Sequence, residues 1–217
     1  MTRSAPRRAG RPKNPIPRER LLAVAREAFA ELGYSGASMS EIAGRAGIRK
    51  PSLFHHFPTK EALYVEAVGE ALAPLGSLVA QAASGDGGFG DRLDELGGLV
   101  VDHFGANPVT ARLLVREILD AGPFLTEAGR DMVRTLLDTV SSFLAAGMEA
   151  GAWPRQDPRH LALSVVAVHL FYWAADPLSG AQIDRSVFHP DEVAARRGEV
   201  VRHVRALVGG GFASQRA

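Results

Sequence analysis

The sequence predicts an all-α protein in which a small N-terminal helical unit is joined to a larger helical bundle, with about nine helices in total. Apolar residues recur every three or four positions along most of the 217 residues, and the alternating patterns typical of strands are nearly absent. Residues 1–60 hold 12 Lys and Arg but only 4 Glu, whereas the remainder holds 13 basic and 20 acidic residues. This division favours a nucleic-acid-binding end attached to a body that does not attract the same polyanion.

Composition excludes several classes of protein. With 46% hydrophobic and 23% charged residues the chain can form a packed core, which excludes wholesale disorder. No window approaches 18 uninterrupted apolar residues, and no apolar stretch follows the basic N-terminus, so we expect neither a membrane span nor a secretory signal. The chain has no Cys, which excludes disulfides and thiolate zinc sites. We expect a cytoplasmic protein with no membrane partner.

The first helix is predicted after a basic arm. Residues 1–17 contain four prolines among basic residues, so we expect a flexible arm there rather than a helix. A helix should begin near Arg18 and end at Gly33, because glycine is common at helix C-termini. Its apolar stripe comprises Leu21, Leu22, Ala25, Ala28, Phe29 and Leu32.

Two short helices should follow. Ser38 and Glu41 match a capping box, in which the Ser38 hydroxyl and the Glu41 carboxylate each bind a free amide at the start of a helix that stops at Gly47. A third helix should start around Pro51, because proline is tolerated in a first turn, and should end before Pro58.

A long fourth helix should begin after Thr59, its N-cap, and Pro74 should kink or end it. The Gly-rich segment 84–90 should form a flexible joint. Five more helices are predicted at about 91–105, 108–120, 124–149, 158–175 and 190–208.

The second and third helices have the layout of a helix-turn-helix, two short helices joined by a tight turn that contains glycine. Ala43 is small enough for the helices to approach each other, and Gly47 tolerates left-handed geometry at the turn. The third helix would then be the recognition helix. Arg49 and Lys50 stand at its N-terminal end, where side chains reach base edges or phosphates in the major groove.

A specific set of motifs extends over residues 18–65. They are Gly33-Tyr34, Ser38, Ile42-Ala43, Ala46-Gly47-Ile48, Ser52-Leu53-Phe54, His56-Phe57 and Lys60-Glu61-Ala62-Leu63. At this spacing they resemble the N-terminal signature of the tetracycline-repressor (TetR) family of bacterial transcription regulators. The resemblance implies a homodimer that represses transcription from a palindromic operator and releases it when a small molecule enters the C-terminal bundle. It also implies a DNA-binding domain at 18–64 and a ligand-binding and dimerisation domain at 65–217.

The resemblance implies which residues contact double-stranded DNA. We assign Ser38, Ser40, Arg49, Lys50, Pro51, Ser52, His55, His56 and Lys60 to this interface. Phe54 departs from the family pattern, since it stands where Tyr usually contacts a phosphate and lacks the hydroxyl. Arg49 replaces the usual small N-cap residue, and Pro51 replaces the commoner Gly and should stiffen the turn. Adjacent His55 and His56 point about 100° apart on a helix, so no metal site and no cofactor is predicted.

The arm provides a second DNA hypothesis. The segment Arg8-Ala9-Gly10-Arg11-Pro12-Lys13 is similar to the Gly-Arg-Pro core of minor-groove hooks. Arg11 would then enter the narrow groove of A·T-rich DNA. Nonspecific attraction of the arm to phosphates is the alternative, and we favour it over groove insertion.

The helix at 158–175 is apolar on nearly every face, so it should contact the bundle core on one side and a second subunit on the other. The last helix would complete an intersubunit four-helix contact, which is where the family dimerises. An ordinary hydrophobic core is the alternative. The predicted interface residues are Val165, Phe171, Val200, Val201, Val204 and Leu207.

Polar and polarisable side chains inside apolar helices indicate the walls of a ligand pocket between the fifth and eighth helices. The candidates are His103, Phe104, Met132, Phe143, Met148, His169, Tyr172 and Trp173. A lone His on an apolar helix can also be a hydrogen-bonded core residue. No dense acidic or basic lining is visible, so the pattern favours a lipophilic or aromatic effector over a sugar phosphate.

The fourth helix is expected to be the lever of the switch, because by sequence it alone should touch both the DNA-binding unit and the bundle. An enzyme is not expected, since the chain lacks Gly-x-Ser-x-Gly, His-Glu-x-x-His, a phosphate loop and a dinucleotide fingerprint. A DNA-binding dimer without any effector remains the alternative. A bundle without a cavity would favour it.

Overall fold

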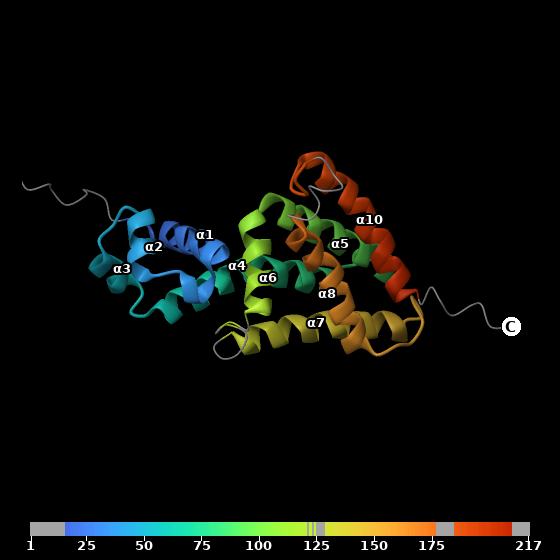
Figure 1. The fold of residues 1–217 in the computed structure, drawn as a ribbon. Helices are drawn as coiled ribbons and strands as arrows, with labels where there is room; N and C mark the ends of the chain where they lie inside the picture. The colour runs from blue at the N-terminus through green and yellow to red at the C-terminus, as the bar shows by residue number, and fades with distance from the viewer. Residues whose placement is uncertain (1–15, 121, 123, 125–128, 177–184, 210–217) are drawn as a thin grey trace, which may run out of the picture.

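The computed structural model of the protein describes residues 16–120, 122, 124, 129–176 and 185–209. Within these residues it has nine α-helices and no strand, which confirms the all-α class. Figure 1 shows α1, α2 and α3 grouped at one end, with α4 running from this group into the bundle formed by the later helices. The helices are α1 (Arg18–Gly36), α2 (Met39–Arg45), α3 (Lys50–His56), α4 (Lys60–Ser84), α5 (Phe89–Ala106), α6 (Pro108–Leu119), α7 (Arg130–Glu149), α8 (Pro158–Ala174) and α10 (Pro190–Val208).

Local signals set the N-terminal helices. The regular part of α1 breaks at Gly33, which has φ 72° and ψ 173°, and one further turn carries the helix to Gly36. Ser38 Oγ accepts a hydrogen bond from the amide of Glu41 at 3.1 Å, as predicted. The prediction that the Glu41 carboxylate also binds a free amide is wrong. This carboxylate instead accepts from Arg45, one turn along the same face, at 3.0 Å. An ion pair at this spacing competes successfully with a neutral amide.

Helix α4 is continuous through Pro74, so the prediction that this residue ends the helix is wrong. Proline has no N–H, so the carbonyl one turn before Pro74 loses its helical hydrogen bond. Pro74 is exposed, so water can bind this carbonyl instead. By length and composition α4 is the one described helix that could cross a membrane. Its apolar face is instead buried within the protein, as in the core helix of a globular fold. The buried residues of α4 are Leu63, Tyr64, Ala67, Val68, Ala71, Leu72, Leu75 and Val79.

Two boundaries differ from prediction in the bundle. The predicted joint at 84–90 shortens to 85–88, and Arg92 ties it down by donating to the carbonyls of Ala82, Ala83 and Gly85 at 2.9–3.2 Å. Helix α7 begins at Arg130 rather than at 124. Phe124 turns into the core instead, where it is 1% exposed.

Helix α10 packs along α5, and glycines on α5 permit this close approach. A Cβ built on Gly98 would lie 2.7 Å from the Arg197 guanidinium, and one built on Gly105 would lie 2.7 Å from Val193. The valine face of α10 is buried here, with Val200 and Val204 at 0% and 2% exposure.

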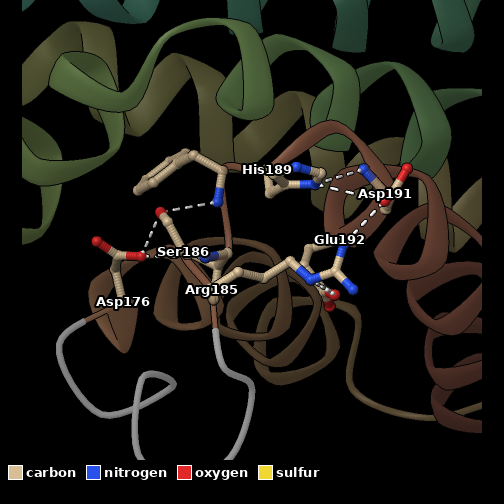
Figure 2. A network of polar contacts seen from close by, with 8 residues as sticks. Asp176, Arg185, Ser186, His189, Asp191 and Glu192 are labelled. Atoms are coloured by element: carbon tan, nitrogen blue, oxygen red, sulfur yellow. Dashed lines mark hydrogen bonds and ion pairs between the residues drawn. The ribbon is translucent and has the colours of Figure 1, made fainter.

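Figure 2 shows a polar network that joins the end of α8 to the start of α10. Ser186 Oγ donates to the Asp176 carboxylate at 2.7 Å, and Arg185 pairs with Asp191 at 2.8 Å. His189 caps α10 by accepting from the amide of Asp191. The network therefore holds the ends of α8 and α10 in a defined relation to each other.

Candidate functional site

The exposed face of α3 is polar, and its inner face is fixed by the core. Leu53 is fully buried, and Ile42 and Phe57 are no more than 1% exposed beside it. The turn before α3 adopts the predicted left-handed geometry, with Gly47 at φ 69°, and the Ile48 amide donates to the Ala43 carbonyl at 2.9 Å. The predicted contact residues outside this core are exposed or half-buried: Ser38, Ser40, Arg49, Lys50, Pro51, Ser52, His55, His56 and Lys60.

The positive charge of this face comes from Arg49 and Lys50. Within the described part of the chain neither forms an ion pair, although the Lys50 ammonium lies 5.8 Å from the centroid of the Phe54 ring. Arg45, by contrast, is committed to Glu31 and Glu41. Arg49 occupies the N-cap position of α3 without a side-chain cap, which leaves its guanidinium directed to solvent.

Lys60 is the first residue of α4, four positions after the last residue of α3. Its ammonium lies 4.5 Å from the centroid of the Tyr34 ring and 3.5 Å from the Ser35 carbonyl oxygen. Partial burial lowers the pKa of Lys60. The side chain is therefore held in place at the edge of the polar face rather than free in solvent.

Arg18 is a structural residue of this domain that sequence reasoning missed. It binds the Glu66 carboxylate, donates to the His56 carbonyl at 2.8 Å and lies 4.1 Å from the centroid of the Phe57 ring. Its partners lie 38 and 48 positions away, so no local pattern could have identified them. Arg18 fixes the end of α3 against α1 and α4. Arg11 lies outside the described residues.

The bundle contains an apolar cavity of about 170 Å³. Its walls come from α4, α5, α6, α7 and α8, and nearly all of the lining side chains are Val, Leu, Ile or Phe. Three of the residues that the sequence predicts for the pocket wall line this cavity: Phe104, Phe143 and His169.

The other predicted pocket residues lie elsewhere. Trp173 packs against Phe104 and Phe188, and Tyr172 packs against Trp173; neither lines the cavity. His103 lines a separate groove between α1, α4, α5 and the start of α6. Met132 is 47% exposed, and Met148 is buried outside the cavity lining. Periodicity indicates that a helix face is buried, but not which buried faces surround a void.

Glu117 on α6 lines the cavity, and sequence reasoning missed it because charged residues of amphipathic helices usually face solvent. It is 2% exposed, and Tyr64 on α4 donates a hydrogen bond to its carboxylate. Burial, together with this hydrogen bond, raises the pKa of Tyr64. The Tyr64 ring in turn packs edge-on against Phe29 and Tyr34, with centroid distances of 4.8 and 4.9 Å. The cavity wall is thus bonded to the core of the helix-turn-helix domain.

A second link joins α6 to α1. Arg116 donates to the carbonyls of Glu31 and Ala30, at 2.5 and 3.3 Å, at the point where α1 breaks. Gly33 permits this approach, because a Cβ there would lie 3.2 Å from Arg116 Nε. The expectation that the fourth helix alone touches both regions is therefore wrong. Helices α6 and α1 are far apart in the sequence, so no local sequence pattern indicates that they pack together.

The predicted dimer residues divide into two groups. Val165, Val200 and Val204 are buried inside the protomer, so these three side chains are not available to a second subunit. For Val200 and Val204 the physical reason is that the glycines of α5 let α10 approach closely and bury its valine face. Val201 and Leu207 are half-buried, and Phe171 is 70% exposed.

Residues 21–67 match the family model of bacterial regulatory proteins of the tetR family, and residues 91–204 match that of the tetracyclin repressor-like C-terminal domain. The HTH-type transcriptional regulator RutR of Escherichia coli (strain K12) is 27% identical over 198 residues, covering 87% of this chain and 91% of RutR. The HTH-type transcriptional activator FasR of Mycolicibacterium smegmatis is 42% identical over 73 residues, which is 32% of this chain and 33% of FasR.

Solved structures share the fold. The putative transcriptional regulator SCO4942 of Streptomyces coelicolor superposes with a TM-score of 0.63 at 26% identity, covering 88% of this chain and 97% of that one. The regulator FadR of Bacillus subtilis in complex with stearoyl-CoA has a TM-score of 0.71 at 16% identity, covering 88% and 98%.

Proposed function

The chain belongs to the tetR family of bacterial regulatory proteins, and on that premise we propose that it represses transcription as a homodimer on a palindromic operator. An apolar small molecule that enters the bundle would release the protein from the operator. The observation that carries this proposal is Glu117, which lines the cavity and is hydrogen-bonded to Tyr64 in the core of the DNA-binding domain. We assign no catalytic role to any residue.

The recognition face supports the DNA-binding part of the proposal. Arg49 and Lys50 supply positive charge at the N-terminal end of α3, and Ser52 and His55 are exposed on the same short helix. Phosphate contacts would position the domain, and side chains further along α3 would read base edges in the major groove. In a symmetric dimer two such helices meet successive major grooves of a palindrome.

The cavity supports the ligand-responsive part. A regulator that only dimerises has no need of an internal void, because voids in cores cost stability. Here a void of about 170 Å³ lies among five helices. The structural relative FadR was solved with stearoyl-CoA, an apolar chain on a polar carrier. An apolar effector is therefore consistent with both the lining and the fold.

Two helices, α4 and α6, connect the cavity to the DNA-binding domain, so a ligand in the cavity would change the position of this domain. Val68 of α4 lines the cavity, while Leu63 on the same helix lies in the N-terminal core. On α6, Glu117 lines the cavity and Arg116 holds the end of α1. A ligand that displaces α6 would thus move α1 and rotate the DNA-binding domain. Since two recognition helices must match a fixed groove spacing, a small rotation is penalised at both half-sites.

The function is tested by selecting the operator from genomic fragments, finding a stabilising compound by thermal shift, and titrating that compound with and without operator. Coupling of about 1–3 kcal/mol predicts that operator affinity falls roughly 5- to 150-fold when the compound is bound. Reciprocity requires operator to weaken the compound by the same factor. Equal affinities for the compound in the two titrations would refute the switch and leave a dimer without an effector.

Two lysines should separate the components of DNA binding. Lys60→Ala should remove a phosphate contact, weakening all sequences alike and lowering the slope of log affinity against log salt by about one unit. Lys50→Ala should cost about 1–3 kcal/mol and relax preference at particular base positions. Binding titrations at several salt concentrations on operator and on unrelated DNA measure both. Unchanged affinity and preference in Lys50→Ala would contradict the placement of the recognition helix.

A further inference from the structure

Phe54 is an apolar side chain on the polar face of α3. It is 39% exposed, and in α2 and α3, which the structure describes completely, it is the one large hydrophobic side chain that is exposed. Its exposed neighbours on the helix, Ser52 and His55, are polar. An aromatic ring gains free energy when apolar surface covers it, so Phe54 is suited to an apolar contact outside the protomer.

The core of the domain does not depend on Phe54. Leu53 and Phe57 fill the inner side of α3, and both are no more than 1% exposed. Neighbouring side chains on a helix point about 100° apart, so the burial of Leu53 directs Phe54 away from the core. Phe54 can therefore be replaced without opening a cavity inside the protein.

Lys50 stands one turn before Phe54 on the same side of α3, because residues four apart on a helix lie above one another. The Lys50 ammonium is 5.8 Å from the centroid of the Phe54 ring. Successive base pairs of DNA are about 3.4 Å apart, so this separation corresponds to about two base-pair steps. The two side chains would thus reach the same part of a half-site.

DNA presents few groups that suit the Phe54 ring. A phenyl ring has no donor or acceptor, so it cannot bind a phosphate as a Tyr hydroxyl can. The apolar group on the base edges of the major groove is the C5 methyl group of thymine, and Phe is one of the side chains that pack against it. A lysine in the same groove binds N7 and O6 of guanine.

We propose that Phe54 selects the operator sequence by packing on the C5 methyl group of a thymine, within about two base pairs of a guanine bound by Lys50. This inference rests on the proposed function, since it concerns what the recognition helix reads. Cytosine has no such methyl group and should be disfavoured at this position. Phe54 would thereby contribute to sequence preference, whereas a phosphate contact such as that of Lys60 contributes alike on all sequences.

The experiment removes the methyl group and nothing else. Each thymine of the selected operator is replaced in turn by deoxyuridine, at the equivalent position of both half-sites, and the affinity of the full chain is measured by fluorescence anisotropy. Burial of one methyl group contributes roughly 4-fold in affinity, so one position should weaken binding about 15-fold over two half-sites.

Variants of the same residue connect this effect to Phe54. Phe54→Ala should bind the thymine and deoxyuridine operators equally at the sensitive position. Phe54→Tyr is the matched control, because it keeps the ring and should keep the sensitivity. Lys50→Ala should relax the preference for the neighbouring guanine while the sensitivity to the methyl group remains. If Phe54→Ala does not fold, Phe54→Gln takes its place, since a polar side chain at this exposed position also removes the ring.

The outcomes separate the inference from the proposed function. Tolerance of deoxyuridine at every thymine of a specifically bound operator would overturn the inference and leave the regulator on its operator. A sensitivity that persists in Phe54→Ala, or a sensitive thymine far from any guanine that Lys50→Ala affects, would overturn it as well. Failure of the unaltered protein to select any genomic fragment would instead contradict the proposed function itself.

Discussion

Phe171→Asp is expected to convert the protein from a dimer to a monomer and to remove specific operator binding. Phe171 is 70% exposed on α8, and Leu163, two turns earlier, is 54% exposed. With Ala167 between them, these residues form an apolar stripe at intervals of four that faces away from the protomer core. The stripe is the surface that the proposed dimer would bury.

The expected size of the effect of Phe171→Asp on dimer affinity follows from the energetics of protein interfaces. A central aromatic residue contributes about 2–4 kcal/mol when truncated, which corresponds to roughly a 30- to 1,000-fold weaker dimer. A monomer binds one half-site only and loses the gain from simultaneous engagement of two. Analytical ultracentrifugation at micromolar concentration measures the first effect and operator titration the second. Because Phe171 is exposed, the thermal midpoint of the separated protomer should change little.

Two variants make this test specific. Leu119→Asp changes a 78% exposed apolar residue on another helix, α6, and should leave the dimer intact. Val204→Asp should unfold the protomer instead, because Val204 is 2% exposed and lies in the core beside α5. A dimeric Phe171→Asp variant would place the interface on another surface.

Arg116→Ala is expected to uncouple the cavity from the DNA. Hydrogen bonds to a charged group contribute about 1.5–3 kcal/mol, which is as large as the whole coupling of a typical allosteric protein. Removing the bonds from Arg116 to the carbonyls of Glu31 and Ala30 should therefore leave a protein that still binds both operator and effector. The effector should no longer release the operator.

The measurement is operator affinity with and without a saturating effector. Arg112→Ala is the matched control, because it removes an equal charge from an exposed position of the same helix and should retain full release. Operator affinity without effector should be similar in both variants and in the unaltered protein. Full release in Arg116→Ala would assign the coupling to α4 alone.

The sequence by itself determined the helix-turn-helix domain. Its first cap and its turn, made by Ser38 and by the left-handed Gly47, depend on residues within a few positions of one another. These interactions are local, so propensity and spacing are sufficient to predict them. Even here the Glu41 carboxylate paired with Arg45, because charge outweighed the expected amide.

The tertiary structure alone decided the bundle. The apolar pattern of α8 and α10 predicted buried faces, but only packing against the glycines of α5 showed that Val200 and Val204 face inward and Phe171 outward. Glu117 and Arg116 find partners in α4 and α1, some 53 and 85 positions away in sequence. Periodicity specifies that a surface is buried and not what covers it, so long-range contacts, voids and exposed stripes emerge only when the helices are assembled.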